Sequence, residues 1–154
     1  MKEAIQKLLQ SEKMVHAFEY LKNDESHAID QQIELVQISS FSPFEEKRAT
    51  RFKELLTEAG LDPVMDEVHN VYAHIHGTGD GPTLYVSAHL DTVFPSETPL
   101  PVRREGTKIY APGIGDDTRG LAEILTMARA ITKSGLKPVG DIIIGGHCCG
   151  TDCR

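Results

Sequence analysis

The sequence predicts an α/β fold in which helices pack against a mixed β-sheet. Apolar residues at helical spacing dominate residues 1–60, short strand-like segments follow, and residues 121–131 form a helix pattern between two apolar strands. Helices followed by strands, and then by a strand–helix–strand unit, indicate a sheet with helices on its faces. A length of 154 residues suits one domain with its own core.

Three helices are expected before the strands. The first is marked by Ile5, Leu8, Leu9, Phe18 and Leu21, and the second by Ile29, Ile33 and Val36. Ser42-Pro43-Phe44-Glu45 is typical of a capping box that opens a third helix. That helix carries an apolar face and ends at Gly60; the face consists of Ala49, Phe52, Leu55, Leu56 and Ala59.

Strand patterns follow at residues 63–68, 70–76, 83–88 and 108–110. The turn-rich sequence GTGDG at residues 77–81 predicts a hairpin between the second and third of these strands. After the helix marked by Leu121, Ile124, Leu125, Ala128 and Ile131, which ends near Gly135, residues 141–146 (DIIIGG) predict a buried strand.

Composition narrows the class of function. A formal net charge of −7 and a pI near 5.4 argue against a nucleic-acid binder. No apolar run is long enough to span a bilayer, and the N-terminus lacks the apolar core of a signal peptide. We therefore expect a cytoplasmic protein without nucleic-acid or membrane partners. The three cysteines all lie in the last seven residues, so they do not predict a disulfide framework.

His89 and Asp91 lie at the C-terminal end of an apolar strand, in SAHLDTV. Residues two apart in an extended segment face the same way, and open α/β sheets place their sites at this end of the strands. A metal-binding histidine usually donates its second ring N–H to a carboxylate, and the adjacent Asp91 can serve that role. For an isolated His-x-Asp the alternative is a solvated pair at a strand end.

A second acidic motif, Gly113-Ile114-Gly115-Asp116-Asp117, stands directly before the helix that contains Leu121. A helix N-cap explains one of the two acids, and Asp117 is the better placed. The cap does not explain the other, and a carboxylate can bridge two cations about 3.5–4 Å apart, which would use Asp116.

Together these segments resemble the co-catalytic zinc exopeptidase family that includes peptidase T, carboxypeptidase G, the aminoacylases and acetylornithine deacetylase. The matching text runs in family order from about Ile29 to Gly146, and GDDTRGLAEI is closest to the peptidase T branch. It comprises SPFEEKRA, HNVYAHIHG, SAHLDTVFP, APGIGDDTRGLAEIL and GDIIIGG. The resemblance implies a three-layer zinc-peptidase-like fold, of which residues 1–154 would be the N-terminal part of the catalytic domain.

The resemblance also implies residue roles. His89 would bind one of two Zn²⁺ ions, Asp116 would bridge both, and Asp91 would act as a catalytic residue by orienting His89. A cis peptide is implied between Asp116 and Asp117. The family does not use His74 and His76, which are expected to be structural because polar residues commonly alternate along a half-exposed strand.

The family pattern ends at the last predicted strand. A Glu-Glu pair should follow it, as general base and zinc ligand, but no glutamate occurs after Glu123. The later ligands, the lid or dimerisation domain and the C-terminal half of the catalytic domain are also unmatched. One metal ligand and one bridge are too few for tetrahedral zinc. We therefore expect a truncated chain that is inactive alone.

The tail HCCGTDC admits two explanations. It offers one histidine and three cysteines, but adjacent cysteines are unlike the usual two-to-four-residue gaps of a zinc site. A shifted reading frame is the preferred hypothesis, because the codons of residues 146–150 read one base later permit Thr, Val, Ala and Glu. The coding DNA decides this point.

The function expected from the family is zinc-dependent exopeptidase hydrolysis of small peptides by metal-activated water. Two alternatives stay open. One is an amidohydrolase that removes the acyl group from N-acyl amino acids, and the other is a noncatalytic remnant that binds a partner through an exposed sheet edge.

Overall fold

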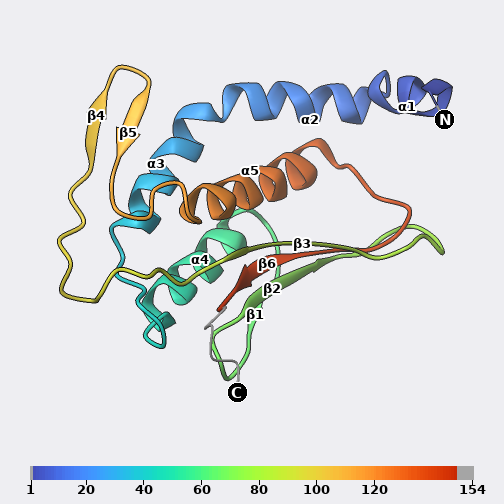
Figure 1. Cartoon of the computed structure of the whole chain (residues 1–154). Coiled ribbons are helices and arrows are strands. Elements are labelled where there is room, and N and C mark those ends of the chain that lie inside the picture. Colours follow the sequence, from blue (N-terminus) through green and yellow to red (C-terminus); the bar gives the residue numbers. More distant parts are fainter. Residues whose placement is uncertain (1, 149–154) are drawn as a thin grey trace.

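The computed structural model describes residues 2–148 (Figure 1). Its helices are α1 (Lys2–Leu9), α2 (Glu12–Asn23), α3 (Glu25–Val36), α4 (Glu46–Glu58) and α5 (Thr118–Ser134). Its strands are β1 (Val64–Met65), β2 (Val71–Ile75), β3 (Leu84–His89), β4 (Arg103–Glu105), β5 (Lys108–Tyr110) and β6 (Ile142–His147). Within the described residues no helix is both long and apolar enough to cross a membrane.

A mixed sheet in the order β1-β2-β6-β3 forms the base of the molecule. β6 runs antiparallel to β2 and parallel to β3, while β4 and β5 form a separate antiparallel pair. β3, α5 and β6 are therefore the expected strand–helix–strand unit. The predicted α/β class and mixed sheet are confirmed.

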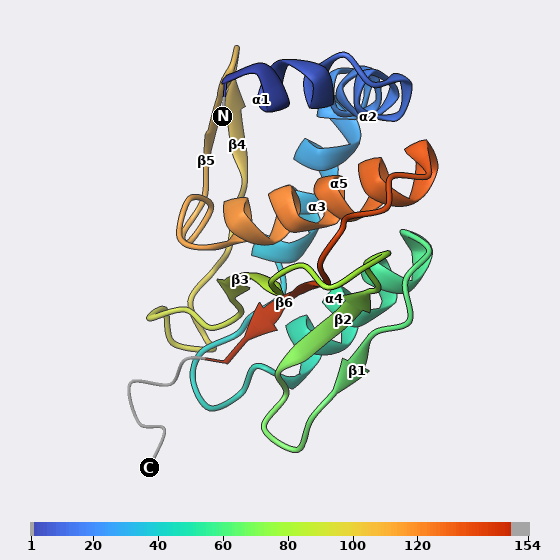
Figure 2. The same ribbon diagram turned by 90° about the vertical axis from the view of Figure 1, so that its right-hand side faces the viewer.

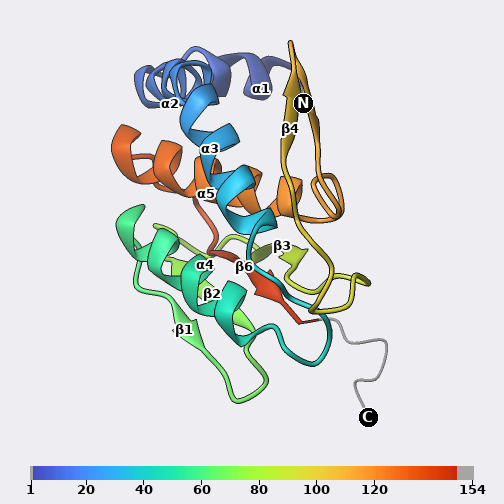
Figure 3. The same ribbon diagram turned by 90° about the vertical axis from the view of Figure 1, so that its left-hand side faces the viewer.

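Helices cover one face of this sheet in successive layers. α5 packs on β3 and β6, α4 packs on β1 and β2, and α2 and α3 pack on α5 from outside. In Figure 2 β2 lies in front of α4, and in the opposite view of Figure 3 α4 lies in front of β2. One buried cluster joins both helices to the sheet, including Phe52, Leu55, Leu121, Leu125 and Ile144.

The opposite face of the sheet is exposed. Along β2, Val71 and Ala73 are buried in the core, whereas the intervening Tyr72 and His74 are exposed. Tyr85 of β3 is 58% exposed on the same alternation.

The expected ends of the longer helices are confirmed. Gly60 follows α4 with a φ of +90°, and Gly135 follows α5 in the left-handed conformation with a φ of +65°. Glycine adopts this conformation without a steric penalty, so both helices end where the sequence predicts. The apolar face predicted for α4 is fully buried.

Two predictions about the first helices are wrong. The segment expected as one helix is divided into α1 and α2 at Ser11, whose hydroxyl donates to the Leu8 carbonyl and so competes with the helical pattern. The capping box at Ser42 is also absent. Residues 41–44 form a turn with a cis Ser42-Pro43 bond, closed by Phe44 N–H donating to Phe41 O, and α4 begins only at Glu46.

The predicted hairpin between β2 and β3 is also wrong, because β6 lies between these strands. The turn at residues 77–81 folds back on residues 138–140 instead, where the Thr78 N–H donates to Pro138 O. The apolar β6 pairs with a strand on each side in this position, which a strand of three isoleucines favours.

Candidate metal centre

His89 is the last residue of β3, and the start of α5 is brought against it. β3 and β6 run parallel, with His89 paired opposite His147, so both strands end at the same edge of the sheet. Gly120 permits the close approach of α5, because a Cβ there would lie 2.9 Å from the Ala88 Cβ. The loop before α5 therefore delivers Asp116 and Asp117 to the strand end.

The side chains of His89 and Asp116 meet. His89 Nε2 lies 2.8 Å from Asp116 Oδ1, and the Asp116 side chain is 90% exposed while that of His89 is 29% exposed. On the other side of the ring, Nδ1 lies 3.0 Å from the backbone oxygen of Asp91 and 3.4 Å from its carboxylate Oδ1. The structure thus brings together all three site residues that the sequence predicts.

These contacts assign the protons of the ring. A carbonyl oxygen only accepts, so Nδ1 carries a proton and donates it to Asp91 O. Nε2 is then the nitrogen that faces Asp116. Without a cation, the contact with the carboxylate requires a second proton on Nε2; a bound metal would replace that proton.

The negative charges around His89 also favour a proton on its ring. Burial alone lowers the pKa of His89, but the hydrogen bond to Asp116 and the charges of Asp91, Asp117 and Asp116 outweigh it. The pKa of His89 therefore lies above its ordinary value. Three carboxylates therefore surround one imidazole, an arrangement that favours a bound cation.

The two adjacent aspartates have different functions. Asp117 is the N-cap of α5: its Oδ1 accepts from the Gly120 N–H at 3.1 Å and its Oδ2 from the His89 N–H at 3.2 Å. The expected cap is confirmed, as is the expected cis peptide between Asp116 and Asp117. Asp116, by contrast, lines a pocket of about 270 Å³ with His89, Asp91 and Phe94.

Sequence reasoning missed Arg48, which supports the segment between His89 and Asp91. Its Nη1 donates to the Leu90 carbonyl at 2.9 Å, and the Ser40 hydroxyl donates to the same oxygen at 2.8 Å. Burial lowers the pKa of Arg48 to about 10, and the charge of Asp91 opposes this shift. Nothing in the sequence around Arg48 indicates this contact, because its partners lie far away in the chain.

The donors present fit part of a metal centre. An imidazole nitrogen and a carboxylate oxygen converge, and both are common zinc ligands. Among residues 2–148, however, no third histidine, cysteine or acidic side chain completes a ligand group around His89 and Asp116. The ring of His147 is the nearest histidine by register, with its centroid 6.5 Å from that of His89.

The proposed alternatives for the tail fall largely outside the described residues. Cys149 and Cys153 are not described, so neither the cysteine site nor the shifted reading frame is tested. Cys148 is described: its backbone N–H donates to Asn70 Oδ1 at 2.8 Å, which continues the β2–β6 pairing beyond the sheet. His74 and His76 lie elsewhere, at the other end of β6.

Comparison with curated proteins finds peptidase relatives. A model for Peptidase family M28 matches residues 70–148, about half of the chain. Carboxypeptidase G2 of Pseudomonas sp. (strain RS-16) is 36% identical over 77 residues, which are 49% of this chain and 18% of that protein. The uncharacterized protein YqjE of Bacillus subtilis (strain 168) is 25% identical over 128 residues, which are 74% of this chain and 34% of that protein.

Solved structures of peptidases share the fold of this chain. A tripeptidase from Staphylococcus aureus superposes with a TM-score of 0.69 at 28% identity, covering 80% of this chain and 36% of that one. Aminopeptidase PepT from Bacillus cereus ATCC 10987 superposes with a TM-score of 0.66 at 24% identity, covering 79% and 35%. The chain spans between 18% and 36% of the lengths of these four proteins. The sequence resemblance named both carboxypeptidase G and peptidase T, and both are among these similar proteins, so the resemblance is confirmed. The chain belongs to peptidase family M28.

Proposed function

We propose that this chain forms the His89–Asp116 part of the centre of a metallopeptidase of exopeptidase type that acts on short peptides. One observation carries the proposal: His89 Nε2 and Asp116 Oδ1 meet at 2.8 Å beside a pocket, at the sheet edge where the two parallel strands end. Family membership and the tripeptidase and carboxypeptidase relatives support the reaction class.

Each residue has a role in this proposal. His89 and Asp116 would hold Zn²⁺, with Asp116 in the bridging position, because its side chain is exposed and keeps oxygen lone pairs for a second ion. Asp91 is a positioning residue, since its backbone carbonyl fixes the His89 ring. When bound, zinc polarises a substrate carbonyl and lowers the pKa of a bound water.

The remaining donors would come from parts of the catalytic domain that this chain does not match. The chain would be the N-terminal segment of that domain. The YxeP protein of Bacillus subtilis, which shares the fold at a TM-score of 0.61, is described as a dinuclear metal-binding peptidase. This supports a centre of two ions.

A chimera tests the activity directly. The matched segment of the Staphylococcus aureus tripeptidase is replaced by the corresponding residues of this chain, and tripeptide hydrolysis is measured with Zn²⁺. We expect hydrolysis that His89→Gln or Asp116→Asn lowers by at least about 100-fold, because each removes a metal donor. His16→Gln, an exposed histidine on α2, is the control. A folded chimera that hydrolyses N-acetyl amino acids and no tripeptide would assign the site to an amidohydrolase.

A measurement on the unmodified chain keeps the proposal testable if the chimera does not fold. We expect Zn²⁺ to shift the His89 ring resonances in NMR spectra, and Asp116→Asn to weaken this effect. Unchanged His89 resonances at millimolar Zn²⁺ would contradict the assignment of His89 as a metal ligand.

A further inference from the structure

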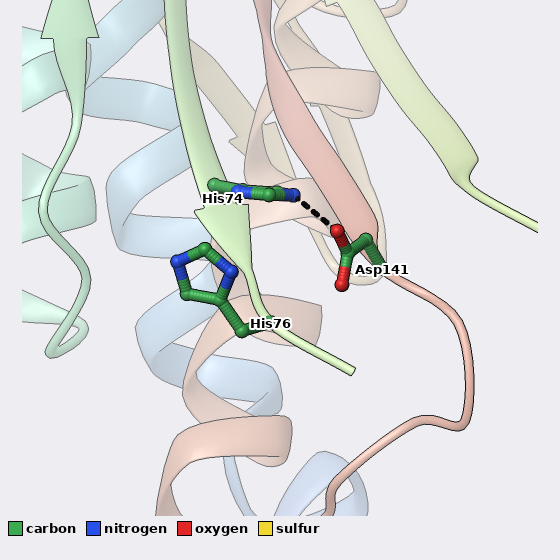
Figure 4. Close-up of side chains that lie close together, drawn as sticks. All are labelled: His74, His76 and Asp141. Atoms are coloured by element: carbon green, nitrogen blue, oxygen red, sulfur yellow. Dashed lines mark ion pairs between the residues drawn. The ribbon is translucent and has the colours of Figure 1, made fainter. Parts of the chain in front are cut away.

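The exposed face of the sheet carries two histidines and an aspartate that no part of the proposed peptidase centre uses. His74 is in β2, His76 directly follows it, and Asp141 directly precedes β6 (Figure 4). One potential ligand atom from each of the three side chains lies within 4.8 Å of the others. We propose that these residues form a separate binding site for a divalent cation of the Zn²⁺ type.

The strand geometry brings the three side chains together. Residues two apart on a strand face the same way, so His74 and His76 are both exposed, while Ile75 between them packs against the core. Ile75 pairs with Ile142, and Asp141 therefore lies beside both histidines. The cluster sits at the start of β6, whereas His89 is paired with His147 at its end.

The carboxylate is oriented by the backbone before any cation binds. Asp141 Oδ1 accepts from the Gly77 N–H at 2.7 Å, and Oδ2 lies 2.9 Å from His74 Nε2. The Gly77 hydrogen bond is the main reason that the pKa of Asp141 lies below its usual range. The close approach at residue 77 requires glycine, because a Cβ there would lie 2.4 Å from the Val139 carbonyl oxygen.

A simple ion pair between His74 and Asp141 explains only part of this arrangement. The His76 ring lies against that of His74, with centroids 4.2 Å apart and planes at 65°. The ion pair with Asp141 is made by His74, whereas a metal binds both imidazoles in the neutral form. Two imidazoles and one carboxylate are a zinc donor set. Zn–N and Zn–O bonds of about 2.0–2.2 Å would require small side-chain rotations that move the ligand atoms closer together.

A bound ion would connect the end of β2 to the start of β6, which are separated by about 65 residues in the sequence. The exposure of both histidines leaves room for water in the remaining coordination positions. Binding to the folded chain alone raises its melting temperature as the ion concentration exceeds the dissociation constant. The site is therefore expected to stabilise the β2–β6 pairing.

Zinc titration by calorimetry tests the proposal on the whole 154-residue chain. The background carries His89→Gln and Asp116→Asn, with all three cysteines replaced by serine, so neither the peptidase centre nor the tail contributes. We expect one Zn²⁺ per chain and a rise in melting temperature of a few degrees with saturating Zn²⁺. His76→Gln and Asp141→Asn should each weaken binding by at least about tenfold.

His16→Gln is the matched control, because it removes an exposed histidine from α2. It should leave both the affinity and the stoichiometry unchanged. No zinc binding at millimolar concentration, or binding that survives His76→Gln and Asp141→Asn, would overturn the proposal. Because the background lacks the peptidase ligands, either result leaves the proposed function untouched.

Discussion

Among single residues, Gly120 decides how closely α5 approaches the site. A Cβ at this position would lie 2.5 Å from Asp117 Oδ1 and 2.9 Å from the Ala88 Cβ. Alanine stabilises a helix by about 1 kcal/mol relative to glycine. Overpacking, however, costs about 1–3 kcal/mol, and here it also displaces the capping side chain of Asp117. We predict that Gly120→Ala lowers the free energy of unfolding in urea. Gly115→Ala, with open space around its Cβ, is the control and should change it by less than about 0.5 kcal/mol.

Residue identities at the site were predictable, but their contacts were only partly so. The motifs around His89 and Asp116 and the cap at Asp117 are local, so the sequence indicates them. Arg48 reaches the Leu90 carbonyl from 42 residues away, and no local pattern reports that contact. His74 and His76 are interpreted from the sequence as structural, because the family does not use them and no local pattern shows that the distant Asp141 lies beside them.

At the level of elements, a buried ion pair fixes the α2–α3 junction to α5. Arg129 Nε donates to Asp24 Oδ2 at 3.0 Å, and both side chains are only 6% exposed. We predict that Arg129→Met lowers the free energy of unfolding by about 3–5 kcal/mol, because the buried charge of Asp24 loses its arginine partner and keeps the contact with the half-exposed His27. Arg119→Met breaks an exposed pair with Glu123 and should cost less than about 1 kcal/mol. Equal losses in denaturant unfolding would contradict this interpretation.

The same ion pair predicts a dependence on pH. Burial alone raises the pKa of Asp24, but hydrogen bonds and charge from Arg129 outweigh it, so the pKa lies below its ordinary value. The stabilisation is then fully present above the unfolded pKa of about 3.9 and is lost as the pH falls through the folded value. Acid unfolding followed by circular dichroism should show this loss, and Asp24→Asn should remove it.

Helix and strand positions were predictable to a greater extent than strand pairing. Periodicity located α3, α4, α5, β2, β3 and β6, because each buries one face or both. Pairing depends on a strand that comes later in the sequence: β6 separates β2 from β3 and begins about 60 residues after the turn that suggested a hairpin. The capping box failed for a similar reason, since residues 41–44 form a turn that bridges to Thr92 rather than a helix start.

For the whole molecule, the number of metal donors limits what the 154-residue chain does alone. Among residues 2–148, His89 and Asp116 supply two converging donors, whereas catalytic zinc sites use three protein ligands and a water. We therefore predict no zinc-dependent tripeptide hydrolysis by the purified chain, measured against the tripeptidase chimera at equal concentration. The ion expected at His74, His76 and Asp141 does not change this, because it lies at the opposite end of β6. Robust hydrolysis that disappears in His89→Gln but persists in His76→Gln would show that the chain completes a catalytic centre by itself, and would refute the donor argument.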